Sequence, residues 1–148
     1  MKVQEIMAND PVCCAPNTSL QEVAALMADR HYGEIPVCES GSKKPIGVIT
    51  DRDITCRVVA KGRNPSELTV REFMTSPCIT VTAESDVDEC CRLMEEHMIR
   101  RLPVVDANGN LQGIVSLADV VRNADKRNTS RLVKGVSQPY EHAARLVV

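Results

Sequence analysis

The chain has 148 residues with 18 Lys or Arg and 20 Asp or Glu, so its formal net charge is −2 at pH 7. This charge argues against a general DNA- or RNA-binding protein, and three aromatic residues in the whole chain argue against a stacking platform for single-stranded nucleic acid. The hydrophobic fraction of 43%, with 26% charged residues, is that of an ordinary globular protein.

The first half of the chain predicts the element order β-α-β-β-α. The apolar run at 12–15 is expected to form a short strand, and Ser19 followed three residues later by Glu22 is a capping pattern for the helix after it. That helix has apolar residues at i, i+3, i+4 and i+7, namely Leu20, Val23, Ala24 and Met27. Two strands at 35–38 and 46–50 then enclose a polar turn, and Thr50 opens a second helix.

The second half predicts the same order again. A short strand at 79–82 precedes Asp86, which stands three residues before Glu89 as a second capping pattern. The helix that follows repeats the apolar spacing at Val87, Cys90, Cys91 and Met94. Strands at 102–105 and 111–116 follow, and Ser116 opens the last helix of the pattern.

These two halves are an internal repeat. Residues 3–37 align with 70–104 at an offset of 67 without a gap, and "GVITDRDI" (47–54) aligns with "GIVSLADV" (113–120) at an offset of 66. We therefore expect an α/β protein with repeat 1 at 1–60, a linker at 61–69 and repeat 2 at 70–125. The tail at 126–148 is expected to be partly helical: "RLVKGV" extends a helix until "SQP" breaks it, and "YEHAARLVV" receives no role.

The repeated segment has two interpretations. Thr50 with Asp53, and Ser116 with Asp119, match the [ST]-x-x-[DE] capping box that satisfies the first free N–H groups of a helix. A hydroxyl and a carboxylate placed side by side at a helix start also complement a phosphate and a ribose diol. One side chain can cap a helix and still present a lone pair to a ligand, so both interpretations stay open.

At these positions the sequence resembles a known family. "GEIPVCESGSKKPIGVITDRDI" and "RRLPVVDANGNLQGIVSLADV" are similar to the second halves of cystathionine-β-synthase (CBS) domains. The chain resembles a tandem pair of such domains, a Bateman module of the stand-alone prokaryotic type, over about residues 1–125. The resemblance implies β-α-β-β-α repeats packed through their sheets about a pseudo-two-fold axis. It also implies a regulatory adenine-nucleotide sensor for energy or metabolites, and not an enzyme.

The resemblance also implies where a ligand binds. AMP, ADP, ATP, a NAD-type molecule or S-adenosylmethionine would occupy clefts between the repeats, with no obligatory cofactor. Asp53 and Asp119 would bind ribose hydroxyls, and Thr50 and Ser116 would lie near phosphate. The adenine would lie against the apolar run before the first helix of the partner repeat, and basic residues would reach phosphate. The residues implied for these two roles are Val12, Cys13, Ile79 and Thr80 for adenine, and Arg100 and Arg101 for phosphate. Arg52 is a further candidate phosphate contact in repeat 1.

The charges beside these two sites are not equivalent. Arg100 and Arg101 precede the second "LPV" strand, whereas Gly33 and Glu34 stand at the same places in repeat 1. A carboxylate next to a phosphate repels it, and repeat 1 has Arg52 where repeat 2 has Ala118. We therefore expect the two sites to differ in affinity or in the preferred number of phosphates. The resemblance further implies a homodimer that forms a four-repeat disc. The apolar helix positions Leu26, Leu93, Met94 and Met98 are candidates for its interface. It leaves the downstream protein partner open.

The alternative hypothesis is a thiol- or metal-responsive regulator that uses the seven cysteines. Their number is odd and no CxxC pair occurs, so we interpret them as small apolar core residues in a reducing compartment. The three histidines are isolated, and no catalytic arrangement is evident from spacing. No apolar run approaches the roughly 18 residues of a membrane span. We therefore expect a cytoplasmic protein with neither a membrane nor a nucleic-acid polymer as partner.

Overall fold

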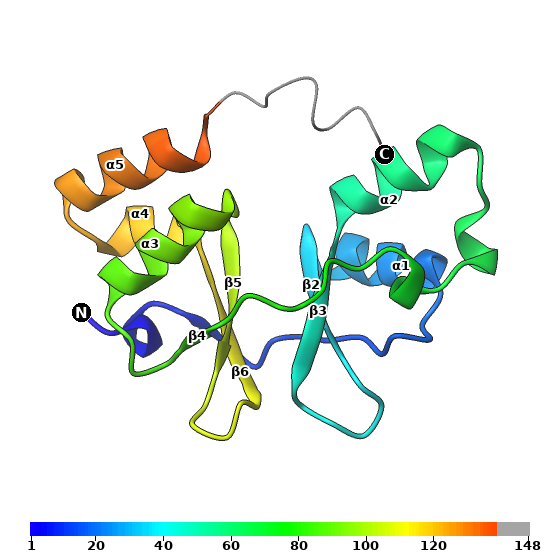
Figure 1. The fold of residues 1–148 in the computed structure, drawn as a ribbon, viewed down its shortest axis with the longest axis horizontal. Coiled ribbons are helices and arrows are strands. Elements are labelled where there is room, and N and C mark those ends of the chain that lie inside the picture. Colours follow the sequence, from blue (N-terminus) through cyan, green and yellow to red (C-terminus); the bar gives the residue numbers. More distant parts are fainter. Residues whose placement is uncertain (139–148) are drawn as a thin grey trace. The chain divides into compact units, whose positions relative to one another are not determined.

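A computed structural model describes residues 1–138, and the segment "YEHAARLVV" with His142 lies outside the described residues. The chain forms two compact units. One unit is Val12–Cys78, here called the Asp53 unit. The other, here called the Asp119 unit, joins Met1–Pro11 to the described residues from Ile79 on (Figure 1).

The Asp53 unit is built on an antiparallel hairpin. Strands β2 (Glu34–Cys38) and β3 (Pro45–Thr50) pair with Ile35 opposite Ile49, and the register shifts after Val37. Helices α1 (Leu20–Arg30) and α2 (Asp51–Arg57) bury their apolar side chains against this hairpin (Figure 1). The helix spacing read from the sequence is confirmed here, since Leu20, Val23 and Met27 are all buried.

The Asp119 unit carries a four-stranded sheet in the order β1-β6-β5-β4. Only β4 and β5 run parallel in it. Its strands are β1 (Ala8–Asn9), β4 (Val81–Thr82), β5 (Arg101–Val105) and β6 (Leu111–Ser116). Its helices are α3 (Val87–His97), α4 (Leu117–Asn123) and α5 (Lys126–Val136).

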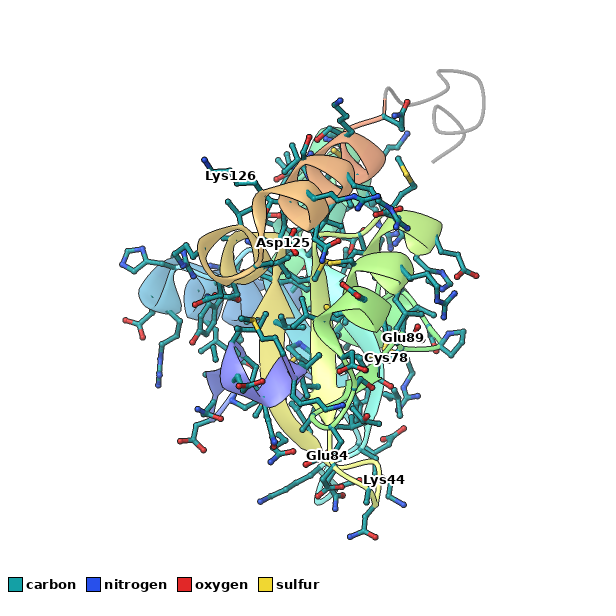
Figure 2. The ribbon with its side chains drawn as sticks, turned by 90° about the vertical axis from the view of Figure 1, so that its left-hand side faces the viewer. Lys44, Cys78, Glu84, Glu89, Asp125 and Lys126 are labelled. Carbon is teal, nitrogen blue, oxygen red and sulfur yellow. The ribbon has the colours of Figure 1, made fainter. Side chains whose placement is uncertain are left out.

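The C-terminal helix α5 belongs to the Asp119 unit. Its first turn is capped by Asp125, whose carboxylate accepts the N–H of Asn128 at 2.8 Å, and Figure 2 shows Asp125 and Lys126 at its start. Leu132 and Val136 are buried in the same core as α3 and α4. The prediction that "RLVKGV" continues a helix as far as "SQP" is confirmed, because α5 ends at Val136.

The first residues of each sequence repeat belong to the unit that holds the rest of the other repeat. Residues 1–11 begin repeat 1 and belong to the Asp119 unit, and residues 70–78 begin repeat 2 and belong to the Asp53 unit. These two stretches are here called the leading segments. Val3 and Ile6 are buried in the core of the Asp119 unit, and their counterparts at an offset of 67, Val70 and Phe73, are buried in the core of the Asp53 unit. The backbone bonds follow the same exchange: Ala8 pairs with Ile114 of β6, while Thr75 pairs with Val48 of β3. The boundaries between the two packing units therefore lie after residue 11 and after residue 78. The expected boundaries 1–60, 61–69 and 70–125 describe the sequence repeat, which differs from the packing units.

Two local predictions need correction. The run 12–15 forms only an isolated bridge, between Cys14 and Val37, and the strand expected at 79–82 is shortened to β4. Ser19 caps α1 as predicted, accepting the N–H of Glu22 at 3.1 Å, but the Asp86 side chain makes no capping bond to α3. Its carboxylate lies 3.0 Å from Lys2 Nζ instead, and this contact lowers the pKa of Asp86.

Among residues 1–138, none of the helices combines the length and the apolar character that crossing a bilayer requires.

Candidate functional site

The first half of the candidate site is the junction of β3 and α2 in the Asp53 unit. Thr50 ends β3 with an extended backbone (φ −114°, ψ 159°), and its Oγ1 accepts the N–H of Asp53 at 3.1 Å. The Asp53 carboxylate returns a bond, since Oδ2 accepts the N–H of Thr50 at 3.0 Å. The N–H of Asp51 donates to the carbonyl of Gly33, which ties the helix start to the start of β2.

The same junction recurs between β6 and α4. Ser116 Oγ accepts the N–H of Asp119 at 3.2 Å, and Asp119 Oδ2 accepts the Ser116 N–H at 2.8 Å and its hydroxyl at 2.6 Å. Here Leu117 donates its N–H to the carbonyl of Arg100. The capping interpretation is therefore confirmed in both repeats. Both carboxylates stay partly open to solvent, with 19% of the Asp53 and 16% of the Asp119 side chain exposed.

Two arginines that are absent from the predicted site contact these carboxylates. Arg57 Nη1 lies 3.9 Å from Asp53 Oδ1, and Arg122 Nη2 lies 2.5 Å from Asp119 Oδ1. The signal was present in the sequence, because residues three or four apart on a helix are neighbours and an Asp–Arg pair at this spacing attracts.

The predicted adenine-facing residues divide between the units. Val12 is half-buried and Cys13 exposed in the Asp53 unit, and Ile79 and Thr80 are half-buried in the Asp119 unit. Each unit therefore holds one apolar run and one hydroxyl–carboxylate pair. The contacts of the described residues bring together Thr50 with Asp53, here called the Asp53 pair, and Ser116 with Asp119, here called the Asp119 pair.

The predicted charge difference lies directly beside the two hydroxyls. In the antiparallel registers Glu34 is opposite Thr50, and Arg101 is opposite Ser116. Directly opposite residues have their Cα atoms about 4.5–5.5 Å apart. Glu34 is only 9% exposed and raises the pKa of the Cys78 thiol by its charge, secondary to burial. Arg101 is half-buried, whereas Arg52 and Arg100 are exposed.

The cysteines give little support to a reactive-thiol site. Burial raises the pKa of four thiols from the ordinary 9.0 to about 12, those of Cys14, Cys38, Cys78 and Cys90. A thiol nucleophile or metal ligand needs the opposite shift, since the thiolate is the reactive form. Within residues 1–138, no group of three or more His, Cys, Asp or Glu side chains is placed to hold a metal ion.

Comparison with known proteins identifies the family. The CBS domain model matches the chain twice, at residues 3–59 and 70–126. The chain belongs to the CBS domain family and contains a tandem pair of these domains. An uncharacterized protein of Methanopyrus kandleri is 37% identical over 122 residues, which cover 82% of this chain but only 62% of that protein. The CBS domain-containing protein YhcV of Bacillus subtilis is 40% identical over 82% of this chain and 84% of its own length.

Solved structures share the fold, and several contain ligands. A CBS domain protein from Pyrobaculum aerophilum complexed with AMP has a TM-score of 0.78 and 26% identity, covering 90% of this chain and 99% of that one. The CBS domain pair of protein MJ0100, in complex with 5′-methylthioadenosine and S-adenosyl-L-methionine, has a TM-score of 0.74 and 28% identity over 82% of this chain and 94% of that one. Hypoxic Response Protein I, with two coordinated zinc ions, has a TM-score of 0.76 and 30% identity over 84% of this chain and 100% of that one.

Proposed function

We propose that this CBS pair is a regulatory module that binds an adenosine-containing ligand without turnover, reading the ribose through Asp53 and Asp119. One observation carries the proposal. In both units a half-buried carboxylate is fixed at a helix start by its own capping box and remains 16–19% exposed. A carboxylate accepts up to about four hydrogen bonds, so one that also caps a helix can receive the two hydroxyls of a ribose.

The ligand class comes from the comparisons. AMP and S-adenosylmethionine, which two of the similar structures hold, share the adenosine group, and the apolar runs at Val12–Cys13 and Ile79–Thr80 are the proposed adenine contacts. Thr50, Ser116, Arg52, Arg100 and Arg101 are the proposed phosphate contacts. AMP, ADP and ATP are the first ligands to test.

Binding to the folded protein must raise its melting temperature, so a thermal-shift panel of adenine and guanine nucleotides, NAD(H) and S-adenosylmethionine selects the ligand. Calorimetry then tests the two carboxylates. We expect Asp53→Ala and Asp119→Ala each to weaken binding at the altered site by about 1.5–3 kcal/mol, because bonds to a charged acceptor are lost.

Asparagine at the same positions separates ribose binding from helix capping. Asp53→Asn and Asp119→Asn keep an oxygen that can accept the capping N–H, so they preserve more of the folding stability than the alanine variants. Both replacements remove the charged acceptor, and both are expected to weaken ligand binding. Unchanged affinity in all four variants contradicts the proposed ribose contacts.

We also propose that the protein forms a two-fold homodimer. Of the apolar positions named for it, Met94 is fully buried in the core of the Asp119 unit and is withdrawn. Leu26, Leu93 and Met98 are half-buried and stay candidates. Exposed apolar side chains in the described part of the chain include Tyr32, Val59, Val121 and Val133. Sedimentation velocity at micromolar concentration should give a species of twice 16.3 kDa, and a 16.3 kDa species alone excludes the dimer.

A further inference from the structure

The two ribose-reading carboxylates differ in how many hydrogen bonds they already accept. Asp119 accepts three, from the N–H and hydroxyl of Ser116 on Oδ2 and from Arg122 Nη2 on Oδ1. Asp53 accepts the Thr50 N–H on Oδ2, and its contact with Arg57 is 3.9 Å long, which is an ion pair beyond hydrogen-bond length.

This difference follows from the position of each arginine on its helix. Arg122 stands three residues after Asp119, and at the offset of 66 its counterpart is Cys56. Arg57 stands four residues after Asp53 and is held elsewhere: Nη1 donates to the carbonyl of Phe73 at 2.7 Å, and the guanidinium lies 5.4 Å from the Phe73 ring centre. Arg122 has 66% of its side chain exposed, against 33% for Arg57.

We propose that Arg122 is an intramolecular competitor for the ribose hydroxyls at Asp119, whereas Arg57 is kept from that role at Asp53 by its bond to the Phe73 carbonyl. The proposal rests on the proposed function, in which both carboxylates read a ribose. A ribose diol donates two bonds, which would bring Asp119 to five against a capacity of about four, so one of the present donors must leave. Arg122, whose side chain is 66% exposed, is the donor that we infer releases Oδ1. At Asp53 the two bonds from the diol and the one capping bond make three accepted hydrogen bonds, which is within the capacity of a carboxylate.

The competition predicts a salt dependence that a purely structural arginine would not produce. An exposed ion pair weakens as salt screens it, whereas hydrogen bonds from an uncharged ligand are little affected. Adenosine, which carries no phosphate, should therefore bind the Asp119 pair more tightly as salt is raised. Its affinity for the Asp53 pair should stay nearly constant, because Arg57 remains held at Phe73.

Amide NMR titration of the full chain with adenosine reads the two pairs separately, through the shifts of Thr50 and Asp53 and of Ser116 and Asp119. Arg122→Gln should raise adenosine affinity at the Asp119 pair about two- to five-fold, the range of a screened surface pair, and should remove its increase with salt. Cys56→Arg places a guanidinium at the matched position of α2 and should lower adenosine affinity at the Asp53 pair.

A charge-matched control comes from α3. Arg92 is similarly exposed and pairs with Glu89 and Glu96, so Arg92→Gln removes the same charge from the same unit and should leave both adenosine affinities unchanged. If Arg122→Gln leaves the Asp119 pair unchanged or weakens it while adenosine still binds, the competitor role is wrong and the proposed function stands. If adenosine shifts neither pair in any variant, ribose reading fails, and the competitor role fails with it.

Discussion

At the residue scale, the side chain opposite each hydroxyl sets the charge that a phosphate would meet. Arg101 faces Ser116 across the β5–β6 pairing, and Glu34 faces Thr50 across the β2–β3 pairing. Arg forks suit phosphate oxygens and carboxylates repel them. The Asp119 pair should therefore gain more affinity than the Asp53 pair when adenosine is replaced by AMP.

Single substitutions test this charge difference. Arg101→Gln should weaken AMP at the Asp119 pair by about 1.5 kcal/mol and leave adenosine unchanged there. Glu34 is buried, so Glu34→Gln is the least disruptive way to remove its charge, and it should strengthen AMP at the Asp53 pair. The measurement is the same amide titration at low and high salt. Equal AMP-to-adenosine ratios in all three proteins would show that both side chains point away from the phosphate.

The thiols with raised pKa values make stability depend on alkaline pH. Cys14, Cys38, Cys78 and Cys90 have folded-state pKa values raised by burial to about 12, against about 9 when unfolded. They hold their protons more tightly in the folded state, so their contribution to stability is complete below pH 9 and is lost as the pH rises toward 12. Urea unfolding at a series of pH values should show the free energy of unfolding falling over this window.

The first repeat supplies a control substitution for the thiol effect. Val23 occupies the position in α1 that Cys90 occupies in α3, and both are fully buried. Cys90→Val should fold and should show a smaller loss of stability between pH 9 and 12 than the wild type. An identical pH profile in the two proteins would assign the alkaline loss to other groups.

At the element scale, the glycine that begins each repeated segment has a packing cause. A Cβ on Gly47 would lie 2.6 Å from the carbonyl oxygen of Thr75, and one on Gly113 would lie 2.7 Å from that of Ala8. Both oxygens belong to the exchanged leading segments, which pair with β3 and β6 at these places. The glycine thus admits a crossing backbone, a role that lies outside the hydroxyl–carboxylate chemistry.

Alanine at either glycine should push the leading segment away from its strand. We expect Gly47→Ala and Gly113→Ala to lower the free energy of unfolding by about 1–3 kcal/mol, as overpacking does. Gln112→Ala, on the neighbouring exposed residue of β6, should stay within about 0.5 kcal/mol of wild type. Chemical denaturation gives these values, and glycine variants as stable as Gln112→Ala would contradict the close approach.

At the scale of the whole molecule, the exchange of leading segments predicts which pieces of chain can fold. Residues 12–78 are contiguous and contain the buried residues Leu68, Val70 and Phe73 together with the hairpin they cover. Residues 1–67 have the same length and contain the entire repeat pattern of the first half, but lack these three side chains. Small domains are only marginally stable, so we expect the loss of three core residues to unfold the 1–67 fragment.

The two fragments can be compared directly. The 12–78 fragment should keep helical circular dichroism and unfold cooperatively, and the 1–67 fragment should do neither. Equal behaviour of the two fragments would mean that the leading segment at 70–76 adds little to the core of the Asp53 unit.

The sequence by itself determined the duplication, the helix, the strand hairpin and the second helix of each repeat, and both capping boxes, because periodicity and capping are local and act within a few residues. It also placed Glu34 and Arg101 at equivalent positions, since the repeat aligns them. The tertiary structure decided what depends on distant residues. Lys2 draws the Asp86 carboxylate away from its cap, Phe73 holds Arg57 away from Asp53, and the leading segments exchange units. Nothing local distinguishes a segment that packs on its own repeat from one that packs on the other, because the same apolar residues suit both cores.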